Sequence, residues 1–221
     1  MPHRRKRALL SLLEKRLKLF PVVGILGARQ TGKSTLLRDL LPPLRAIKYV
    51  TLDRDEARSQ ALRAPSLFLQ NLESDLIKTV CIDEVQKAPV LFDTIKAEVD
   101  EKKRPGRFAI SGSTEFSKKT GIRESLTGRI SLLRVFPLNL AEIVEADSCF
   151  SLAKGEAHRR APKIKLQTVQ AWLERGGMPG VFAIRESANR DALWDRWVET
   201  TCSRALAQFG IPRFNPELAR R

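Results

Sequence analysis

The chain alternates between short apolar runs and longer segments in which apolar residues recur at helical spacing. The apolar runs predict five β-strands, at residues 21–26, 46–52, 76–82, 107–111 and 130–135. The segments between them predict helices at residues 33–41, 53–63, 66–72 and 90–100. Strands that alternate with helices form a parallel sheet with helices on both faces. We therefore expect an α/β fold with a five-stranded parallel sheet, whose ligand lies beyond the carboxyl ends of the strands.

The two ends of the chain also predict helices. At residues 5–19, leucines recur among Arg and Lys at roughly amphipathic spacing, and we expect this helix to pack on the following domain. Its basic face could instead meet nucleic acid or a membrane surface. Residues 169–174 and 188–209 predict two further helices, separated by a glycine-rich break at 176–180. Trp194 and Trp197 share a stripe of the last helix, which is more typical of a core than of a ligand platform.

These patterns predict four segments along the chain. They are a basic N-terminal helix at 1–20, an α/β core at 21–146, a polar and basic linker at 147–167, and a helical extension at 168–221. The extension is shorter than an ordinary domain, so we expect it to be an incomplete C-terminal domain.

The glycine-bounded loop after the first predicted strand carries the clearest chemistry. Its residues 27–34 match the P-loop pattern G-x-x-x-x-G-K-[S/T], between an apolar strand and a helix. Backbone N–H groups and the helix N-terminus would then surround a polyphosphate. The alternative is a glycine loop that only joins strand to helix, with a solvated lysine. The residues expected to bind the nucleotide are Gly27, Ala28, Arg29, Gln30, Thr31, Gly32, Lys33, Ser34 and Thr35.

Two acids at the end of the third predicted strand indicate a metal site beside this loop. Asp83 is expected to hold Mg²⁺, and the hydroxyl of Ser34 is the second expected ligand. Glu84 would aim its carboxylate at the water that attacks the γ-phosphate, while Lys33 neutralises the β and γ phosphates. Without the P-loop, a solvated loop or a helix cap would explain paired acids equally well.

The acidic pair also separates classes of P-loop protein. A GTPase would need an N-K-x-D motif, which this chain lacks. A small-molecule kinase must protect its ATP from water, so a glutamate beside the aspartate is less expected there; residues 121–129 could nevertheless form the lid of such an enzyme. ATP hydrolysis is the favoured reaction.

Two further polar features could complete the site. Ser113, or less favourably Ser111, follows a predicted strand and could sense the γ-phosphate or position water, although a simple turn explains it equally well. Arg129 could stabilise transition-state charge from a neighbouring subunit, as an arginine finger does, which would require a homo-oligomer. An ordinary surface arginine is the alternative.

Charge and cysteine content add little to the predicted fold and function. The net charge is +15, and most of the surplus lies at the two ends of the chain, because residues 41–150 hold 17 basic and 16 acidic side chains. Basic ends suggest a nucleic-acid partner or a solvated surface. Three scattered cysteines and two isolated histidines favour neither disulfides nor a zinc site. With no long apolar run and no cleavage site, we expect a soluble cytoplasmic protein that does not bind membranes.

The order of motifs resembles that of a large family of bacterial and archaeal predicted ATPases of the AAA+ superfamily. The segments that carry the resemblance are residues 27–34, 49–53, 82–89, 110–113, 125–129, 136–142 and 176–179. The resemblance implies a P-loop NTPase core with the P-loop and Walker-B strands adjacent, magnesium-dependent ATP binding, and Glu84 as the hydrolytic base. In that family a conserved C-terminal domain of unknown function usually follows, so this chain looks C-terminally shortened.

The sequence therefore predicts a protein that binds ATP with Mg²⁺ and hydrolyses it to drive a conformational change. The alternative from another class is a nucleotide-dependent binding switch, on nucleic acid or a protein partner, with little turnover. A small-molecule P-loop kinase is the third interpretation.

Overall fold

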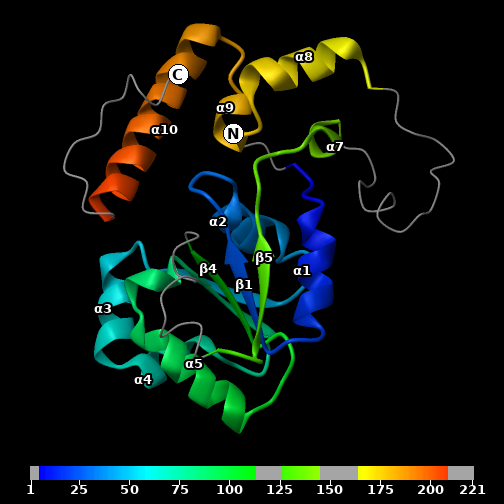
Figure 1. Ribbon diagram of the computed structural model, residues 1–221. Coiled ribbons are helices and arrows are strands. Elements are labelled where there is room, and N and C mark those ends of the chain that lie inside the picture. Colours follow the sequence, from blue (N-terminus) through cyan, green and yellow to red (C-terminus); the bar gives the residue numbers. More distant parts are fainter. Residues whose placement is uncertain (1–4, 113–125, 145–163, 209–221) are drawn as a thin grey trace, which may run out of the picture. The chain divides into compact units, whose positions relative to one another are not determined.

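The computed structural model describes residues 5–112, 126–144 and 164–208, with side chains up to Cys202 in the last range. The described residues form two compact units, one with residues 5–112 and 126–144 and the other with residues 164–208, and each is described by itself. The larger unit holds the predicted sheet (Figure 1).

Five parallel strands form one sheet in the order β2-β3-β4-β1-β5, which confirms the predicted α/β architecture. The strands β1 and β3 are buried along their whole length, and β4 likewise, as their nearly continuous apolar sequences require. The strands are β1 (Val22–Leu26), β2 (Ile47–Thr51), β3 (Thr79–Asp83), β4 (Phe108–Gly112) and β5 (Ile130–Arg134).

The expectation that the P-loop and Walker-B strands are adjacent was wrong. Phe108 of β4 pairs with Val22 of β1 on one side and with Val80 of β3 on the other, so β4 separates the two strands. Strand order depends on where each crossover helix packs against the sheet, which the order of motifs along the chain does not encode. As a result, the carboxyl end of β4 lies between the P-loop and the acids of β3.

One face of the sheet is covered by α1 (Leu9–Leu17) and by the helix that follows the P-loop. Leu13 and Leu17 are fully buried with Val23 and Ile25 of β1, so the N-terminal helix packs on the domain as expected. The helix after the P-loop begins as α2 (Lys33–Thr35) and continues as the π-helical segment η1 (Leu36–Leu40). At the end of η1, the backbone N–H of Leu41 donates to the carbonyl of Leu36, which is the five-residue spacing of a π-helix.

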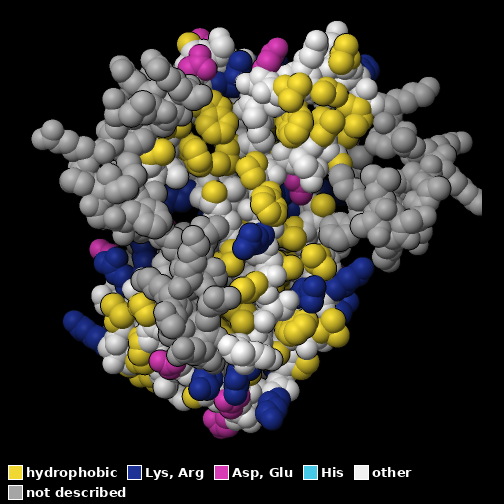
Figure 2. Space-filling view, viewed as in Figure 1, with side chains coloured by type: hydrophobic (Ala, Val, Ile, Leu, Met, Phe, Trp, Pro, Cys, Tyr) yellow, Lys and Arg dark blue, Asp and Glu magenta, His cyan; other side chains and the backbone are white. Residues whose placement is uncertain are grey.

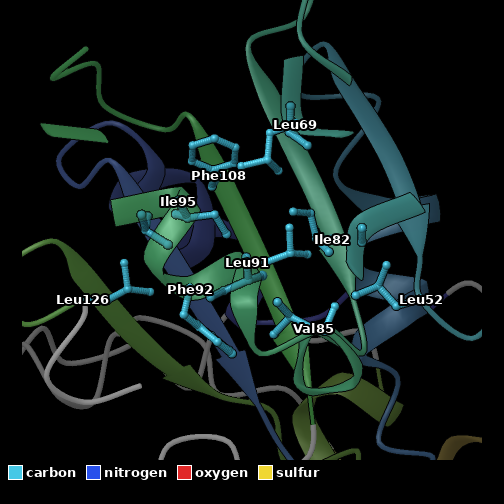
Figure 3. Close-up of a cluster of buried hydrophobic side chains, with 14 of the residues drawn as sticks. Leu52, Leu69, Ile82, Val85, Leu91, Phe92, Ile95, Phe108 and Leu126 are labelled. Carbon is cyan, nitrogen blue, oxygen red and sulfur yellow. The ribbon is translucent and has the colours of Figure 1, made fainter. Parts of the chain in front are cut away.

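The opposite face is covered by α3 (Asp55–Arg63), α4 (Pro65–Leu72) and α5 (Val90–Glu101). Apolar residues of α5 recur at three- and four-residue spacing, so Leu91, Phe92 and Ile95 all point toward the sheet. In Figure 3 they lie among Ile82 of β3 and Phe108 of β4. A short turn, η2 (Val85–Lys87), follows β3 and adds Val85 to the same cluster.

The third strand begins later than its apolar sequence predicts. The backbone N–H of Ile77 bonds to the carbonyl of Ser74 in a turn, and Leu76 remains 84% exposed. The strand itself starts at Thr79, whose hydroxyl donates to the Gly106 carbonyl. The apolar run thus contains the end of a turn as well as the strand.

A buried arginine lies immediately before β4. Arg107 is 2% exposed, and its guanidinium donates to Glu73 Oε1 at 2.6 Å and to Glu73 Oε2 at 2.9 Å. It also donates to the carboxylate and the backbone carbonyl of Glu98 on α5. This cluster connects the end of α4, the last turns of α5 and the start of β4.

The smaller unit contains α8 (Leu166–Arg175), α9 (Pro179–Phe182) and the long α10 (Ser187–Gln208). Trp194 and Trp197 pack edge to face with ring centroids 5.7 Å apart. Gly176 ends α8 with a φ of +70°, and a Cβ there would lie 2.8 Å from the Trp194 ring. The tryptophans therefore pack within this unit. The start of α8 falls inside the predicted linker, most of which lies outside the described residues.

In the described ranges 5–112, 126–144 and 164–208, the helices are too short or too polar to cross a membrane. At the lower end of the face shown in Figure 2, Lys and Arg side chains lie beside Asp and Glu side chains.

Candidate functional site

The glycine-bounded loop lies between β1 and α2, at the carboxyl edge of the sheet. Gln30 and Gly32 both adopt left-handed backbone conformations, with φ values of 62° and 95°. Gly32 does so at no steric cost, whereas Gln30 is a strained position of the kind found at ligand clamps. The side chains of Ala28, Arg29 and Gln30 are exposed. Left-handed residues directly before the start of a helix are typical of backbone concavities that bind anions through N–H groups.

Gly27 is required by a close approach between this loop and the end of β5. A Cβ on Gly27 would lie 2.5 Å from the backbone oxygen of Val135, closer than real Cβ contacts allow. The backbone N–H of Val135 in turn donates to the Leu26 carbonyl at 2.6 Å. The first glycine of the motif thus fixes the position of the loop against its neighbouring strand.

We expect Gly27→Ala to destabilise the fold by about 1–3 kcal/mol, because the added methyl group must displace either the loop or the backbone after β5. Urea unfolding measures the change. Gly180→Ala is the matched control, since a Cβ there meets nothing within 4 Å. Equal losses in both variants would contradict the assigned role of Gly27.

Lys33 lies beneath the loop with only 5% of its surface exposed. Its ammonium donates to the carbonyls of Gly27 at 2.9 Å and Ala28 at 2.8 Å. Burial lowers the pKa of Lys33, while the nearby carboxylates of Glu84 and Asp83 act in the opposite direction. The cation is thus held between the loop and the two acids. Thr31, which is fully buried, donates its hydroxyl to the Ala28 carbonyl at 2.9 Å.

Arg7, one of the basic residues near the N-terminus, contacts the P-loop. Arg7 donates to the carbonyl of Thr31 at 2.8 Å and to that of Phe136 at 2.6 Å, and it pairs with Glu142 at 3.1 Å. Glu142 belongs to α7 (Leu140–Ile143), where it forms a capping box with Asn139. The charge of Arg7 therefore holds together three segments of this unit. The sequence carries no local signal for these contacts because they join residues up to 135 positions apart.

Asp83 ends β3 and is 3% exposed. Its Oδ2 accepts a hydrogen bond of 2.8 Å from the Tyr49 hydroxyl, and its Oδ1 accepts one from Ser111. Burial, followed by the Asp83 charge, raises the pKa of Tyr49, so the phenol stays protonated and donates. Sequence reasoning ranked Ser111 second and did not single out Tyr49 for a role. Side chains alternate between the two faces of a strand, so Tyr49 and Thr51 of β2 lie on the same face. Because Thr51 pairs with Asp83, Tyr49 lies on the face of the sheet that carries Asp83.

Glu84 follows with a left-handed backbone, at φ 56° and ψ 40°. This conformation is costly for a residue with a Cβ, and it turns the chain sharply out of the buried strand. The Glu84 carboxylate accepts a hydrogen bond from Gln86 Nε2, and Gln86 Oε1 is buried with no partner among the described residues. The structure thus places an unsatisfied acceptor two residues from Glu84, a suitable environment for a bound water.

The remaining predicted residues divide into three groups. Ser34 and Thr35 follow Lys33 within α2, and both are half-buried. Ser113 lies outside the described residues. Arg129 precedes β5, so it lies at the amino edge of the sheet, opposite the loop, and pairs with Asp100 at 2.6 and 2.9 Å. The Arg129 guanidinium lowers the pKa of that carboxyl. Within one chain, Arg129 is not brought to the loop.

A glycine-rich loop between a buried strand and a helix, with a lysine held beside two strand-end acids, defines a P-loop NTPase fold. The chain belongs to the AAA domain family, whose model matches residues 19–144, more than half of the chain. This agrees with the resemblance to AAA+ ATPases seen in the motifs.

Two mycobacterial relatives match most of the chain. They are the proteins named Uncharacterized protein Mb2031c, from Mycobacterium bovis, and Uncharacterized protein Rv2008c, from Mycobacterium tuberculosis. Each is 30% identical over 200 residues, which is 90% of this chain and 39% of the relative. The chain therefore spans about two fifths of the length of these relatives.

A solved structure shares the fold. The Walker-type ATPase PABY2304 of Pyrococcus abyssi is 18% identical and superposes with a TM-score of 0.52 over 100% of this chain and 78% of that one. At this identity the likeness supports the AAA-type architecture and no finer property.

Proposed function

We propose that this chain binds ATP with Mg²⁺ at the P-loop and hydrolyses it to ADP and phosphate. The observation that carries the proposal is the meeting, at one edge of the sheet, of the P-loop lysine with Asp83 and Glu84. Strands β1 and β3 are not neighbours, so this meeting depends on the fold. Both acids lie near enough to Lys33 to raise its pKa, against the larger effect of burial, which lowers it.

The loop and Lys33 suit the phosphates. Backbone N–H groups at the start of a helix stabilise anions, and Lys33 adds a positive charge that is already fixed in place by two carbonyls. Because the lysine is held before any ligand arrives, little side-chain entropy remains to be lost on binding. Its exposed neighbour Arg29 adds a second positive charge at the rim of the same loop.

The donor set near the phosphates suits Mg²⁺, which prefers oxygen ligands and retains several waters. Ser34 would offer a hydroxyl and Asp83 a carboxylate, and a bound Mg²⁺ would neutralise phosphate charge. The Asp83 carboxylate is held from both sides by neutral hydroxyl donors, Tyr49 and Ser111.

Glu84 is the residue proposed to take the proton from the attacking water. Its left-handed backbone directs it away from the buried strand, and Gln86 holds its carboxylate. A carboxylate whose orientation is fixed by such a donor can accept the proton of a water placed beside it.

The proposal is tested by ATP binding and phosphate release in Lys33→Ala. We expect the affinity for ATP to fall about 10- to 100-fold, because a hydrogen bond to a charged group contributes about 1.5–3 kcal/mol. Titration calorimetry measures the affinity, and removal of Mg²⁺ with a chelator should abolish phosphate release. Lys18→Ala is the control, since Lys18 pairs with Glu14 on the exposed side of α1. Unchanged ATP binding in Lys33→Ala would refute the site.

The alternative of a nucleotide-dependent switch is distinguished by the same experiment. Tight ATP binding without phosphate release would favour the switch over the hydrolase. Arg129 could enter the chemistry only from a neighbouring chain and after its pair with Asp100 breaks. Such a role would require an oligomer whose turnover depends on protein concentration.

A further inference from the structure

Tyr49 contacts the metal side of the proposed site, although it belongs to neither the P-loop nor β3. It lies at the third position of β2, opposite Cys81, with its ring half-buried against the cluster that includes Leu37 and Leu41. Its hydroxyl reaches the carboxyl edge of the sheet and donates to Asp83 Oδ2 at 2.8 Å. Tyr49 is the only tyrosine in the chain.

The two oxygens of Asp83 are held from opposite directions. Tyr49 comes from β2 and Ser111 from β4, the two strands that flank β3 in the sheet. Two hydrogen bonds from different strands fix both the position and the rotation of the carboxylate. A carboxylate has about four lone-pair directions, so each oxygen can still accept a water or a cation while both donors remain in place.

We propose that Tyr49 is a positioning residue for the divalent cation, which it serves by holding the Asp83 carboxylate in ligand geometry. The inference rests on the proposed function, because it requires that a cation binds there. Mg²⁺ demands near-octahedral geometry and takes few protein ligands, so the orientation of each ligand matters. Loss of a hydrogen-bond partner behind a metal ligand typically costs 10- to 100-fold in metal affinity or activity.

The test is Tyr49→Phe, which keeps the ring in its packing position and removes only the hydroxyl. We expect Mn²⁺, used as a spectroscopic substitute for Mg²⁺, to bind the ADP complex about 10- to 100-fold more weakly by electron paramagnetic resonance. Binding of ADP in the presence of chelator should stay unchanged. Phosphate release should need more Mg²⁺ to reach half-maximal rate and should recover at saturating Mg²⁺.

Two further variants make the result specific. Ser111→Ala removes the other donor to Asp83 and should weaken Mn²⁺ binding in the same direction. Thr94→Val removes a hydroxyl that donates to the Val90 carbonyl within α5 and should leave Mn²⁺ binding unchanged. A thermal unfolding midpoint close to that of the parent would show that Tyr49→Phe is folded.

The outcomes separate this inference from the proposed function. If the parent binds Mn²⁺ with ADP and Tyr49→Phe binds it equally well, the positioning role is overturned and the proposed function stands. Equal weakening of ADP binding with and without the cation would also overturn it, since the defect would then lie in the loop. If the parent itself binds no Mn²⁺ with ADP or ATP, the proposed magnesium site fails first.

Discussion

Glu84→Gln is expected to bind ATP as the parent does and to release phosphate about 10²- to 10⁴-fold more slowly, the contribution of a general base. The amide matches the carboxylate in size but cannot accept the proton of the attacking water. The exchange leaves the left-handed backbone and the neighbouring Gln86 in place. Single-turnover phosphate release measures the chemical step, and calorimetry with a non-hydrolysable ATP analogue measures binding.

A surface glutamate provides the control for this result. Glu101 ends α5, at the amino edge of the sheet and far along the chain from the P-loop, so Glu101→Gln should release phosphate at the parental rate. If Glu84→Gln hydrolysed ATP as fast as the parent, another group would have to act as the base. If it lost ATP binding as well, Glu84 would serve the structure of the site instead.

Arg107→Met is expected to destabilise the larger unit by about 3 kcal/mol or more. The guanidinium is buried, whereas the carboxylates of Glu73 and Glu98 are 25% and 16% exposed, so solvent compensates part of the loss. Methionine would leave two carboxylates without their common cation and would remove one of the two donors to the Glu98 carbonyl, which also accepts from the Lys102 backbone N–H. Urea unfolding followed by circular dichroism measures the free energy of unfolding.

The control for Arg107→Met is a substitution in an ion pair on the surface. Arg58 pairs with Asp55 at 2.7 Å on α3, where the aspartate side chain is 84% exposed. Pairs of this kind contribute about 0–1 kcal/mol, so Arg58→Met should change stability little. A loss in Arg107→Met no larger than in Arg58→Met would show that the buried cluster does not hold α4, α5 and β4 together.

The strands and most helices could be predicted from local pattern because each buried strand is almost wholly apolar and each covering helix has one apolar face. The predictions were least accurate where an apolar run extended into a turn. Leu76 and Ile77 belong to the approach to β3, and only pairing with β2 selects Thr79 as its first residue. The short helix α7 depends on a capping box that the apolar pattern does not reveal.

The site was predictable to the extent that its residues are close together in sequence. A P-loop and a strand-end Asp-Glu pair are contiguous motifs, so their chemistry can be predicted before the fold is known. Their supporting residues are not contiguous. Tyr49 and Ser111 reach Asp83 from 34 and 28 positions away, and Arg7 reaches Thr31 from 24 positions away.

The sequence by itself determined the class of fold, the loop that matches the P-loop pattern and the two strand-end acids, because these depend on residue types at short, fixed spacing. The tertiary structure alone decided the strand order, and with it the insertion of β4 between β1 and β3 that brings Ser111 to Asp83. It likewise directed Arg7 toward the loop and placed Arg129 at the opposite edge beside Asp100. The physical reason is that hydrogen bonds and ion pairs between distant segments form only after the hydrophobic core has fixed the backbone that carries them.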